Sequence, residues 1–293
     1  MTPRRIVVVG DVMLDVVVRP EAPIALTSDT PSAIHLGRGG SGANLAVALA
    51  ALGHDVTYVG AAGDDVGQRT FVEDLARHGV RCELMHAPVS TGVVVSMVDA
   101  DGQRAMLSDR GANRALEVSF VLECLRAPFD HLHVSGYTLL DDATRDVART
   151  ALDAARAHEA STSVDVCSSA PLHALGAAAF LAASEGVNWL FANEEEALEL
   201  GTHTDLEAAL TRLTQRFDEV LVTRGRHGAV VGAGASRTNV AALGRSVLDT
   251  TGAGDAASGT YLGARLDGRR IEESLDVAMR AAALVVGVLG ASS

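Results

Sequence analysis

The sequence contains no lysine, so all 24 of its basic residues are arginines. This absence excludes a lysine-based phosphate loop, a Schiff-base enzyme and a kinase of the protein-kinase type, because each of them needs a lysine amine. With 37 acidic residues the formal net charge is −13, which argues against a nucleic-acid backbone as partner. A bound phosphate would therefore have to be held by backbone dipoles, arginines or a metal ion.

Cysteines and long apolar runs are also scarce. The three cysteines, Cys82, Cys124 and Cys167, are far apart, so neither a disulfide framework nor a zinc site is indicated, and we expect a cytoplasmic location. The apolar run near the N-terminus is interrupted by Asp11 too early for a signal peptide. The longest late apolar run, 281–289, is about half of a membrane span, so we expect no membrane partner.

The 293 residues and the 48% hydrophobic content suffice for a large α/β unit with a buried core. Residues 6–9 are a β-branched run that predicts a buried central strand ending at Gly10. Farther along, strands expected at 131–134, 163–166 and 189–192 alternate with helices expected at 142–158 and 172–183. This alternation predicts parallel βαβ units.

Four other short runs have strand patterns, near 16–18, 33–36, 91–98 and 104–108. The first two are joined by an irregular segment that contains prolines, and the last two by a hairpin-turn signal at 99–102. We expect these strands to form a small separate sheet that covers a site as a lid and excludes water from it.

The stretch 247–259 places two glycines and a carboxylate at the expected start of a helix. Gly252 and Gly254 leave backbone N–H groups unshielded where the helix N-terminus favours an anion, so a phosphoryl group would fit there. A carboxylate beside a phosphate is repulsive unless it takes a proton from an attacking nucleophile, which makes Asp255 a candidate base. In the structural alternative, a residue before the glycines caps the helix and the glycines form an ordinary tight loop.

Residues 37–44 contain the pattern Gly-x-Gly-x-x-Gly before an expected helix, which is the dinucleotide-binding fingerprint. The fingerprint belongs after the first buried strand of the sheet, however, and that strand ends at Gly10. Alternatively, Gly39 and Gly40 let the backbone approach a polyhydroxylated ligand whose hydroxyls bind the Asn44 amide. A plain helix entry also remains open.

Two features in the middle of the chain have both structural and functional interpretations. Asn193 and Glu196 have the spacing of a capping box, and they could also order water around Mg²⁺. The expected strand and glycine loop at 221–228 could border a nucleotide or simply make a hairpin. His131 and His133 share one strand face as a metal pair would, but no third ligand stands nearby in sequence, so packed histidines are favoured.

Taken in order, these motifs resemble those of the ribokinase-like family of carbohydrate kinases, the PfkB family. The resemblance covers nearly the whole chain and rests on 39–44, on Asn193-x-x-Glu196 and on 249–255. It implies a three-layer α/β/α fold with a mostly parallel central sheet and a small β lid. The expected organisation is a single domain, 1–293, with lid segments at about 12–37 and 91–109.

The resemblance also implies a role for each matching residue. Asp255 would deprotonate the acceptor hydroxyl, and the anion hole for the transferring phosphoryl group would be formed by Gly252, Ala253 and Gly254. The sugar would be bound by Asp15, Gly39, Gly40 and Asn44.

On the nucleotide side, Asn193 and Glu196 would organise Mg²⁺ and phosphates, with Glu196 acting through water, and ATP would be bordered by Thr223, Gly225 and Gly228. A monovalent cation such as K⁺ would be held by Asp249, Thr251 and Gly290.

Some positions depart from the family pattern. True ribokinases tend to carry lysine at the position of Ser41 and an acid at that of Gly136, so strict ribokinase activity is not expected. Ala257 stands where many relatives have phenylalanine, which widens or repacks the local wall. Relatives usually continue beyond the position of Gly290, whereas this sequence ends at Ser293.

We therefore expect an ATP-dependent phosphotransferase that acts on the primary hydroxyl of a sugar or nucleoside and forms a homodimer through its lid. One alternative is a sugar- or nucleotide-binding regulator of the same fold without turnover, although binding alone needs no base such as Asp255. The other is a Rossmann-type dehydrogenase built on Gly37, Gly39 and Gly42.

Overall fold

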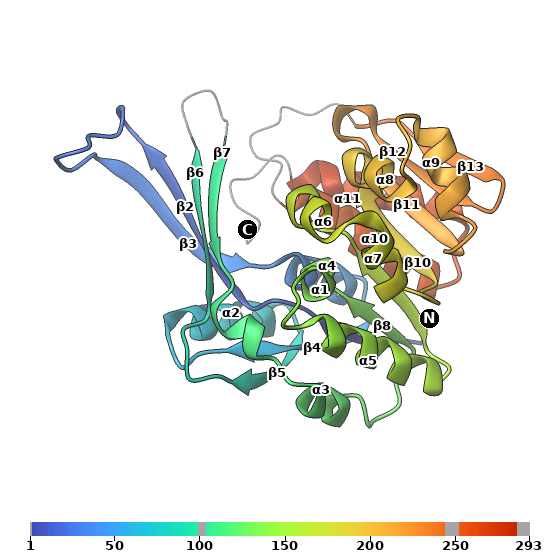
Figure 1. The fold of residues 1–293 in the computed structure, drawn as a ribbon, viewed down its shortest axis with the longest axis horizontal. Coiled ribbons are helices and arrows are strands. Elements are labelled where there is room, and N and C mark those ends of the chain that lie inside the picture. Colours follow the sequence, from blue (N-terminus) through green and yellow to red (C-terminus); the bar gives the residue numbers. More distant parts are fainter. Residues whose placement is uncertain (1, 99–103, 244–251, 286–293) are drawn as a thin grey trace.

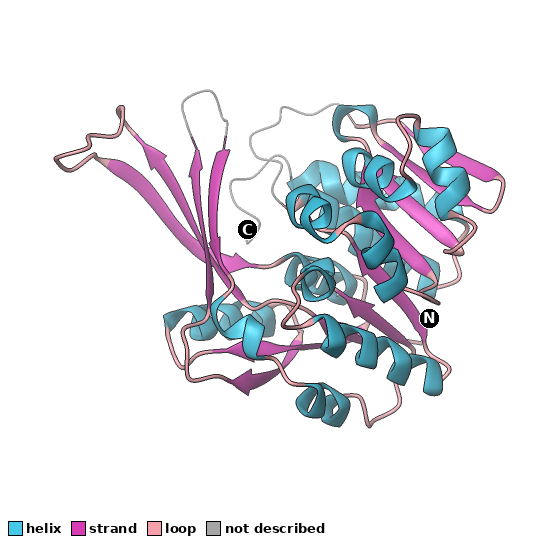
Figure 2. Ribbon diagram, viewed as in Figure 1, coloured by secondary structure: helices cyan, strands magenta, loops and turns pink. Residues whose placement is uncertain are grey.

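The computed structural model describes residues 2–98, 104–243 and 252–285. A large sheet forms the middle layer (Figures 1 and 2). Its nine strands are β1 (Arg5–Val9), β4 (Asp55–Ala62), β5 (Arg81–His86), β8 (His131–Val134), β9 (Ser161–Asp165), β10 (Trp189–Asn193), β11 (Glu219–Thr223), β12 (Ala229–Ala233) and β13 (Ser236–Val240). Their order is β13-β12-β11-β10-β9-β8-β1-β4-β5, and only the pairings of β12 with β11 and β13 are antiparallel. The predicted mostly parallel central sheet is confirmed.

Helices cover both faces of this sheet. One core contains Ile6 and Val8 of β1 and is covered by α1 (Ser41–Ala51), α2 (Val66–Arg77), α10 (Ala253–Leu266) and α11 (Ile271–Val285). The other contains Val7 and Val9 and is covered by α3 (Val118–Cys124), α4 (Gly136–Leu140), α5 (Arg145–Ala157), α6 (Ser169–Leu175), α7 (Ala177–Ala183), α8 (Glu194–Gly201) and α9 (Leu206–Leu213). Alternation along the strand thus supplies both cores, and the three-layer α/β/α architecture is confirmed.

The helix predicted at 172–183 is wrong in one respect. The structure has two short helices, α6 and α7, which meet at Gly176 with φ +89°. Glycine adopts this left-handed conformation without strain and interrupts the helical pattern that the flanking alanines and leucines suggest. The helix expected at 142–158 begins only at Arg145, after a turn.

The small sheet predicted from the four short strand patterns is present. Its strands are β3 (Ser32–Gly39), β2 (Met13–Pro20), β6 (Gly92–Val98) and β7 (Arg104–Asp109), in that order. Figure 1 shows that this sheet projects away from the main body. The turn expected at 99–102 lies outside the described residues.

One face of the small sheet is apolar. The pairing register lines up Leu36, Val16, Val95 and Leu107 in one row across the strands, and Ile34, Val18, Met97 and Ala105 in the next. Side chains on a strand alternate between faces, so Asp15 and Val17 point to the opposite side. Among the described helices, none has the length and apolar character needed to cross a membrane.

Candidate active site

Asp255 lies in the first turn of α10, which begins directly after Gly252. Gly252 has φ +77°, a left-handed conformation that strains residues with a Cβ. Gly254 is exposed, and a Cβ added to it would find no atom of the described residues within 4 Å. The start of α10 is therefore open where the sequence predicts an anion.

Two residues of α1 contact the Asp255 carboxylate. Asn44 Nδ2 donates to Asp255 Oδ2 at 2.8 Å, and Ser41 Oγ lies 2.7 Å from Asp255 Oδ1. α1 begins after Gly40, whose φ is +99° and where a Cβ would come within 2.6 Å of the Asp11 carbonyl oxygen. The early glycine motif and the late glycine motif therefore meet in one cluster.

Arg38 fixes the orientation of the Asn44 amide. This buried arginine donates from Nη1 to Asn44 Oδ1 and from Nε to Asp74 Oδ2, both at 2.6 Å. Because the Asn44 carbonyl oxygen is engaged by a donor, its NH₂ group must face Asp255. Neither Arg38 nor Asp74 was predicted as a site residue; Arg38 stands inside the early glycine motif, whereas Asp74 on α2 gives no sequence signal.

The surroundings of Asp255 favour a carboxyl that exchanges protons near neutral pH. Burial raises its pKa to about 6, and the nearby Asp165 charge acts in the same direction. The hydrogen bonds from Asn44 and Ser41 and the charge of Arg38 oppose this rise, because they stabilise the carboxylate. A base is most effective when its pKa lies near the working pH.

Asp15 lies at the base of the small sheet, on β2. A Cβ on Gly39 would come within 1.9 Å of Asp15 Oδ1, so glycine at this position leaves room for the carboxylate. Burial raises the pKa of Asp15 to about 6, and the charge of Arg38 partly offsets this effect. The structure thus brings together Asp15, Gly39, Gly40 and Asn44, the four residues expected to bind the acceptor.

Asp165 belongs to the same cluster and was missed from the sequence. It ends β9, where its Oδ2 accepts a hydrogen bond from Ser41 Oγ and its Oδ1 accepts one from Gly136 N, both at 2.6 Å. An acid at the carboxyl end of a buried strand is a known ligand position in α/β sheets. The position of Asp165 near the carboxyl end of a predicted buried strand could therefore have identified it from the sequence.

Asn193 and Glu196 form the predicted capping box at the start of α8. Asn193 Oδ1 accepts from Glu196 N at 2.9 Å, and Glu196 Oε2 accepts from Asn193 N at 2.8 Å. Glu196 is buried, and burial together with the charges of Asp165 and Asp255 raises its pKa to about 7. A buried acid with a raised pKa is the kind of group that a nearby cation would stabilise in its ionised form.

The loop after β11 connects it to the antiparallel β12, so the hairpin interpretation is correct for its backbone. Gly228 has φ +86°, and a Cβ there would meet Val240 O at 2.0 Å, whereas Gly225 faces open space. A shallow depression of about 480 Å³ joins this loop to the start of α8, and its lining is Asn193, Glu194, Glu195, Leu198, Thr223, Arg224 and Gly225. Three of the residues expected on the nucleotide side, Asn193, Thr223 and Gly225, therefore share one surface.

The structure removes one alternative, confirms the packed histidines and leaves one prediction outside the described residues. Gly37 and Gly39 lie in β3 of the small sheet, so the dinucleotide fingerprint and the dehydrogenase interpretation lose their basis. His131 and His133 are buried and stack on Trp189 and Phe191, so they are packed rather than a metal pair. Within the described residues no cluster of three or more potential metal ligands was found. The residues expected to hold K⁺, which are Asp249, Thr251 and Gly290, lie outside the described residues.

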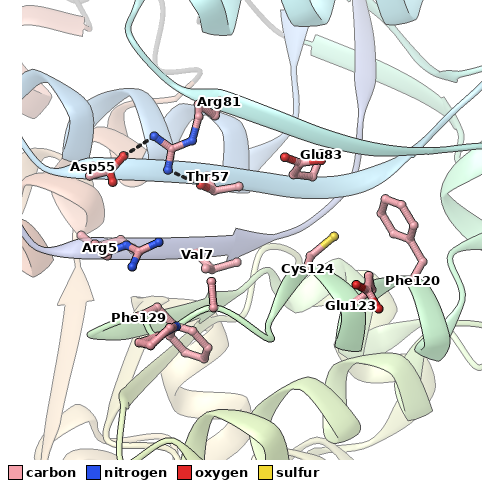
Figure 3. A pocket seen from close by; sticks show the side chains of 13 residues that line it. Arg5, Val7, Asp55, Thr57, Arg81, Glu83, Phe120, Glu123, Cys124 and Phe129 are labelled. Atoms are coloured by element: carbon pink, nitrogen blue, oxygen red, sulfur yellow. Dashed lines mark hydrogen bonds and ion pairs between the residues drawn. The ribbon is translucent and has the colours of Figure 1, made fainter.

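A separate hollow of about 370 Å³ lies at the opposite, amino-terminal edge of the sheet (Figure 3). It is bordered by β1, β4, β5 and α3, and Arg81 crosses its rim to donate to Asp55 at 2.6 Å and to Thr57 at 3.0 Å. It shares no residue with the cluster around Asp255. The candidate catalytic residues therefore lie at the carboxyl edge of the sheet and not in this hollow.

Comparison with solved structures defines the class of protein. Adenosine kinase from Sinorhizobium meliloti matches with a TM-score of 0.87 and 26% identity, over 100% of this chain and 96% of that chain. A putative ribokinase II from E. coli, solved in complex with ATP and Mg²⁺, shares the fold with a TM-score of 0.88 at 21% identity, over 99% and 96% of the two chains. The fold is that of the ribokinase-like kinases.

Sequence comparison identifies the family. The pfkB family carbohydrate kinase model matches residues 3–293, and the chain belongs to this family and is a carbohydrate kinase. It is 31% identical over 259 residues to the ATP-dependent ribose-1-phosphate kinase of Halopiger xanaduensis, covering 87% of this chain and 82% of that protein. The resemblance noted from the motifs is confirmed.

Proposed function

We propose that this protein transfers the γ-phosphoryl group of ATP to the primary hydroxyl of a sugar or of a sugar-containing molecule such as a nucleoside. The observation that carries the proposal is the position of Asp255. It stands in the open first turn of α10 and is held there by Asn44 and Ser41 from the other glycine motif. This arrangement puts a carboxylate of raised pKa beside a helix N-terminus suited to an anion.

In the proposed reaction, the acceptor lies against Asp15, Gly39, Gly40 and Asn44. Asp255 takes the proton from the acceptor hydroxyl as its oxygen attacks the γ-phosphorus in line. The bond from the γ-phosphorus to the leaving ADP oxygen breaks, and the backbone N–H groups of Gly252, Ala253 and Gly254 stabilise the charge on the transferred group. The small sheet acts as a lid that keeps water from competing with the acceptor.

ATP and Mg²⁺ are proposed on the nucleotide side. Asn193, Thr223 and Gly225 line the shared depression and Gly228 makes the adjoining turn, so these residues would border ATP. Glu196 fits an indirect role, because one of its oxygens is used in the capping box and its buried charge would be relieved by a cation. Mg²⁺ would neutralise the phosphates and stabilise the charge that develops during transfer.

We also propose that Asp249, Thr251 and Gly290 hold K⁺. The measurement is turnover in potassium chloride against tetramethylammonium chloride at equal ionic strength. Loss of activity with the organic cation, and its recovery on adding K⁺, is the expected result. Equal rates in both salts would remove the cation from the proposal.

We further propose that two chains pair through the apolar face of the small sheet. Ile34 is 63% exposed, Leu36 53% and Leu107 61%, and they belong to two rows of apolar residues across all four strands. An exposed apolar patch of this kind marks an interaction surface.

We propose that the reaction takes place in a reducing cytoplasm. The three cysteines are free, which agrees with such a location.

The experiment that tests the proposed function is ADP release from Mg-ATP across a panel of pentoses, hexoses, keto-deoxy acids, sugar phosphates and nucleosides. Asp255→Asn is the inactive variant, and Asp267→Asn at the other end of α10 is its matched control. Release that depends on one class of acceptor and is lost only in Asp255→Asn supports the proposal. ATP binding without release for any acceptor would favour the non-catalytic regulator.

A further inference from the structure

A line of polar side chains runs along one face of β8 and β9, inside the core. The register pairs His131 with Ser161 and His133 with Ser163, and the two-residue alternation of both strands keeps these four side chains on one face. Asp165 follows at the next position of that face and ends β9 at the active-site edge. The line therefore extends from the amino-terminal edge of the sheet to the Asp255 cluster.

Hydrogen bonds connect the middle of this line without a gap. His131 Nδ1 lies 2.8 Å from Ser161 Oγ, and its Nε2 lies 2.8 Å from Ser163 Oγ. The same Ser163 hydroxyl lies 2.9 Å from His133 Nδ1. Both imidazoles and Ser163 are fully buried, and burial lowers the pKa of both histidines, so the rings are neutral at physiological pH.

At the active-site end the line reaches the catalytic carboxylate through Ser41. His133 Nε2 lies 3.8 Å from Asp165 Oδ1, and it is buried and has no hydrogen-bond partner among the described residues. Ser41 Oγ then lies 2.6 Å from Asp165 Oδ2 and 2.7 Å from Asp255 Oδ1. A hydroxyl donates only one hydrogen, so the two short contacts are both satisfied only if one carboxyl carries a proton and donates it to Ser41.

The chain of neutral rings and hydroxyls has two self-consistent proton orders. In the first, the donors point toward the active site: Ser161 donates to His131, His131 to Ser163, Ser163 to His133, and His133 Nε2 faces Asp165 with a hydrogen. In the second, every bond is reversed, and Ser161 donates to Asp130 O, which lies 3.3 Å away. A proton that enters at one end and leaves at the other converts one order into the other without placing a charge on either ring.

We propose that Ser41, Asp165, His133, Ser163, His131 and Ser161 form a relay that carries the acceptor proton from Asp255 to the opposite edge of the sheet. The inference rests on the proposed kinase function. The chain begins in the second order, in which His133 Nε2 is free to accept. After Asp255 has taken the proton, its Oδ1–H passes to Ser41 Oγ while the Ser41 hydrogen passes to Asp165 Oδ2. The Asp165 carboxyl then turns so that this hydrogen faces His133 Nε2, and it delivers the proton once the two residues approach by about 1 Å. The chain passes into the first order and releases one proton to water at Ser161. When the products leave, the chain returns to the second order by taking up a proton at Ser161 and releasing one from the Asp255 cluster.

The relay gives the proton a second exit, at the far edge of the sheet. A protonated Asp255 cannot accept another proton, so its proton must move away before the next turnover. Ser161 is only partly buried, and it adjoins Asp130, whose carboxylate is 39% exposed. The proton can therefore leave at the far edge before the products depart.

Other ionisable groups surround the relay and bear on any titration of it. Near the two carboxylates these groups are Arg38, Glu196 and Cys167. Near His131, the neighbouring strand β10 contributes Trp189, which pairs in register with Glu219 of β11. Glu219 is held by Tyr261 and by Arg265 of α10.

The test is ¹⁵N NMR of the full chain with labelled histidines, titrated between about pH 5 and 8 without ATP or acceptor. In the wild type, protonation of the Asp255 cluster should exchange the donor and acceptor nitrogens of His133 and His131 together, while both rings remain neutral. In Ser163→Ala the exchange should be confined to His133. Asp255→Asn should remove the step centred at the Asp255 pKa of about 6 from both rings.

Ser184→Ala is the matched control, because Ser184 is also a buried serine but donates to Phe180 O outside the relay; it should retain both histidine transitions. If Ser163→Ala does not fold, Ser41→Ala, at the partly exposed end, should uncouple both rings from Asp255. Rings that keep one tautomer across the titration, or a His131 transition that survives in Ser163→Ala, would overturn the relay. No kinase turnover is needed, so a failed acceptor panel and a failed relay are separate results.

Discussion

Asn44 donates a hydrogen bond of 2.8 Å to Asp255, a residue 211 positions later in the chain. This bond joins the motif expected to bind the acceptor to the motif expected to activate it. Arg38 holds the other end of the Asn44 amide, so the amide is oriented before any ligand arrives.

Replacing Asn44 by alanine should raise the KM for the acceptor more than the KM for ATP. The substitution removes the proposed hydroxyl contact and one donor to Asp255, so the pKa of Asp255 should also rise, because the lost bond stabilised the carboxylate. Steady-state kinetics with each substrate varied in turn measures both constants. A larger effect on the KM for ATP would contradict the assignment of Asn44 to the acceptor pocket.

Gly254→Ala should reduce phosphoryl transfer while leaving the fold intact. A Cβ at Gly254 meets no described atom, and alanine is favoured over glycine in a helix by about 1 kcal/mol, so the Tm should be unchanged or higher. The methyl group would occupy the side from which we propose the phosphoryl group approaches. Gly228→Ala is the contrasting variant, because its Cβ would collide with Val240 O and should lower the Tm. Full activity in Gly254→Ala would contradict the anion-hole role.

The pH dependence should follow the ionisation of Asp255. Its pKa of about 6 predicts that kcat/KM falls as the pH drops below about 6, because the protonated carboxyl cannot accept the acceptor proton. A pH profile of kcat/KM with the acceptor found in the panel measures this limb. A rate that stays constant down to about pH 4.5 would exclude Asp255 as the titrating base.

The raised pKa of Asp255 also predicts how the stability of Asp255→Asn compares with that of the wild type. Burial raises the folded-state pKa of Asp255 above the ordinary aspartate value of 3.8. The ionised carboxyl therefore disfavours folding once the pH exceeds the folded pKa, and the penalty disappears below the unfolded pKa. Asp255→Asn should therefore be more stable than the wild type at pH 7, by on the order of 2 kcal/mol, and equal to it near pH 3.5. Urea unfolding at both pH values tests this difference, and an equal gain at both would rule out ionisation as its cause.

Leu36→Glu should shift the oligomeric state toward the monomer. The residue lies in an apolar row with Val16, Val95 and Leu107, and a buried unpaired charge would oppose pairing of two such faces. His35→Glu is the matched control, since His35 is an exposed neighbour on the other face of β3. Light scattering after size-exclusion chromatography gives the mass. A wild type that is already monomeric, or two variants that dissociate equally, would contradict pairing through this face.

Much of the fold followed from local patterns in the sequence. The β-branched run at 6–9 and the alternation after residue 129 are properties of neighbouring residues, and they predicted β1, β8 and the parallel sheet. The patterns were less informative where tertiary contacts decide the outcome. The edge strand β5 and the short helices α3 and α9 were not predicted, and the break at Gly176 depends on one backbone conformation.

The site residues also fall into those that local signals predicted and those that only tertiary contacts revealed. Asp255, Asn44 and the capping box were found because glycine motifs and cap spacings are local signals. Asp165 and Arg38 were not assigned to the site, because their roles depend on contacts with residues that the sequence alone does not bring together. Ser41 contacts Asp165 across 124 residues and Asp255 across 214 residues.

The sequence by itself determined the class of chemistry, because its motifs are made of neighbouring residues and can be recognised, together with their order, without knowing any distant contact. Only the tertiary structure decided the protonation of the site. The pKa of Asp255 is set by burial and by charges from β9 and β3, and the path through His133 exists only because β8 and β9 pair in one register. A shift of that register by one residue would turn the serines to the opposite face, with no change in any motif.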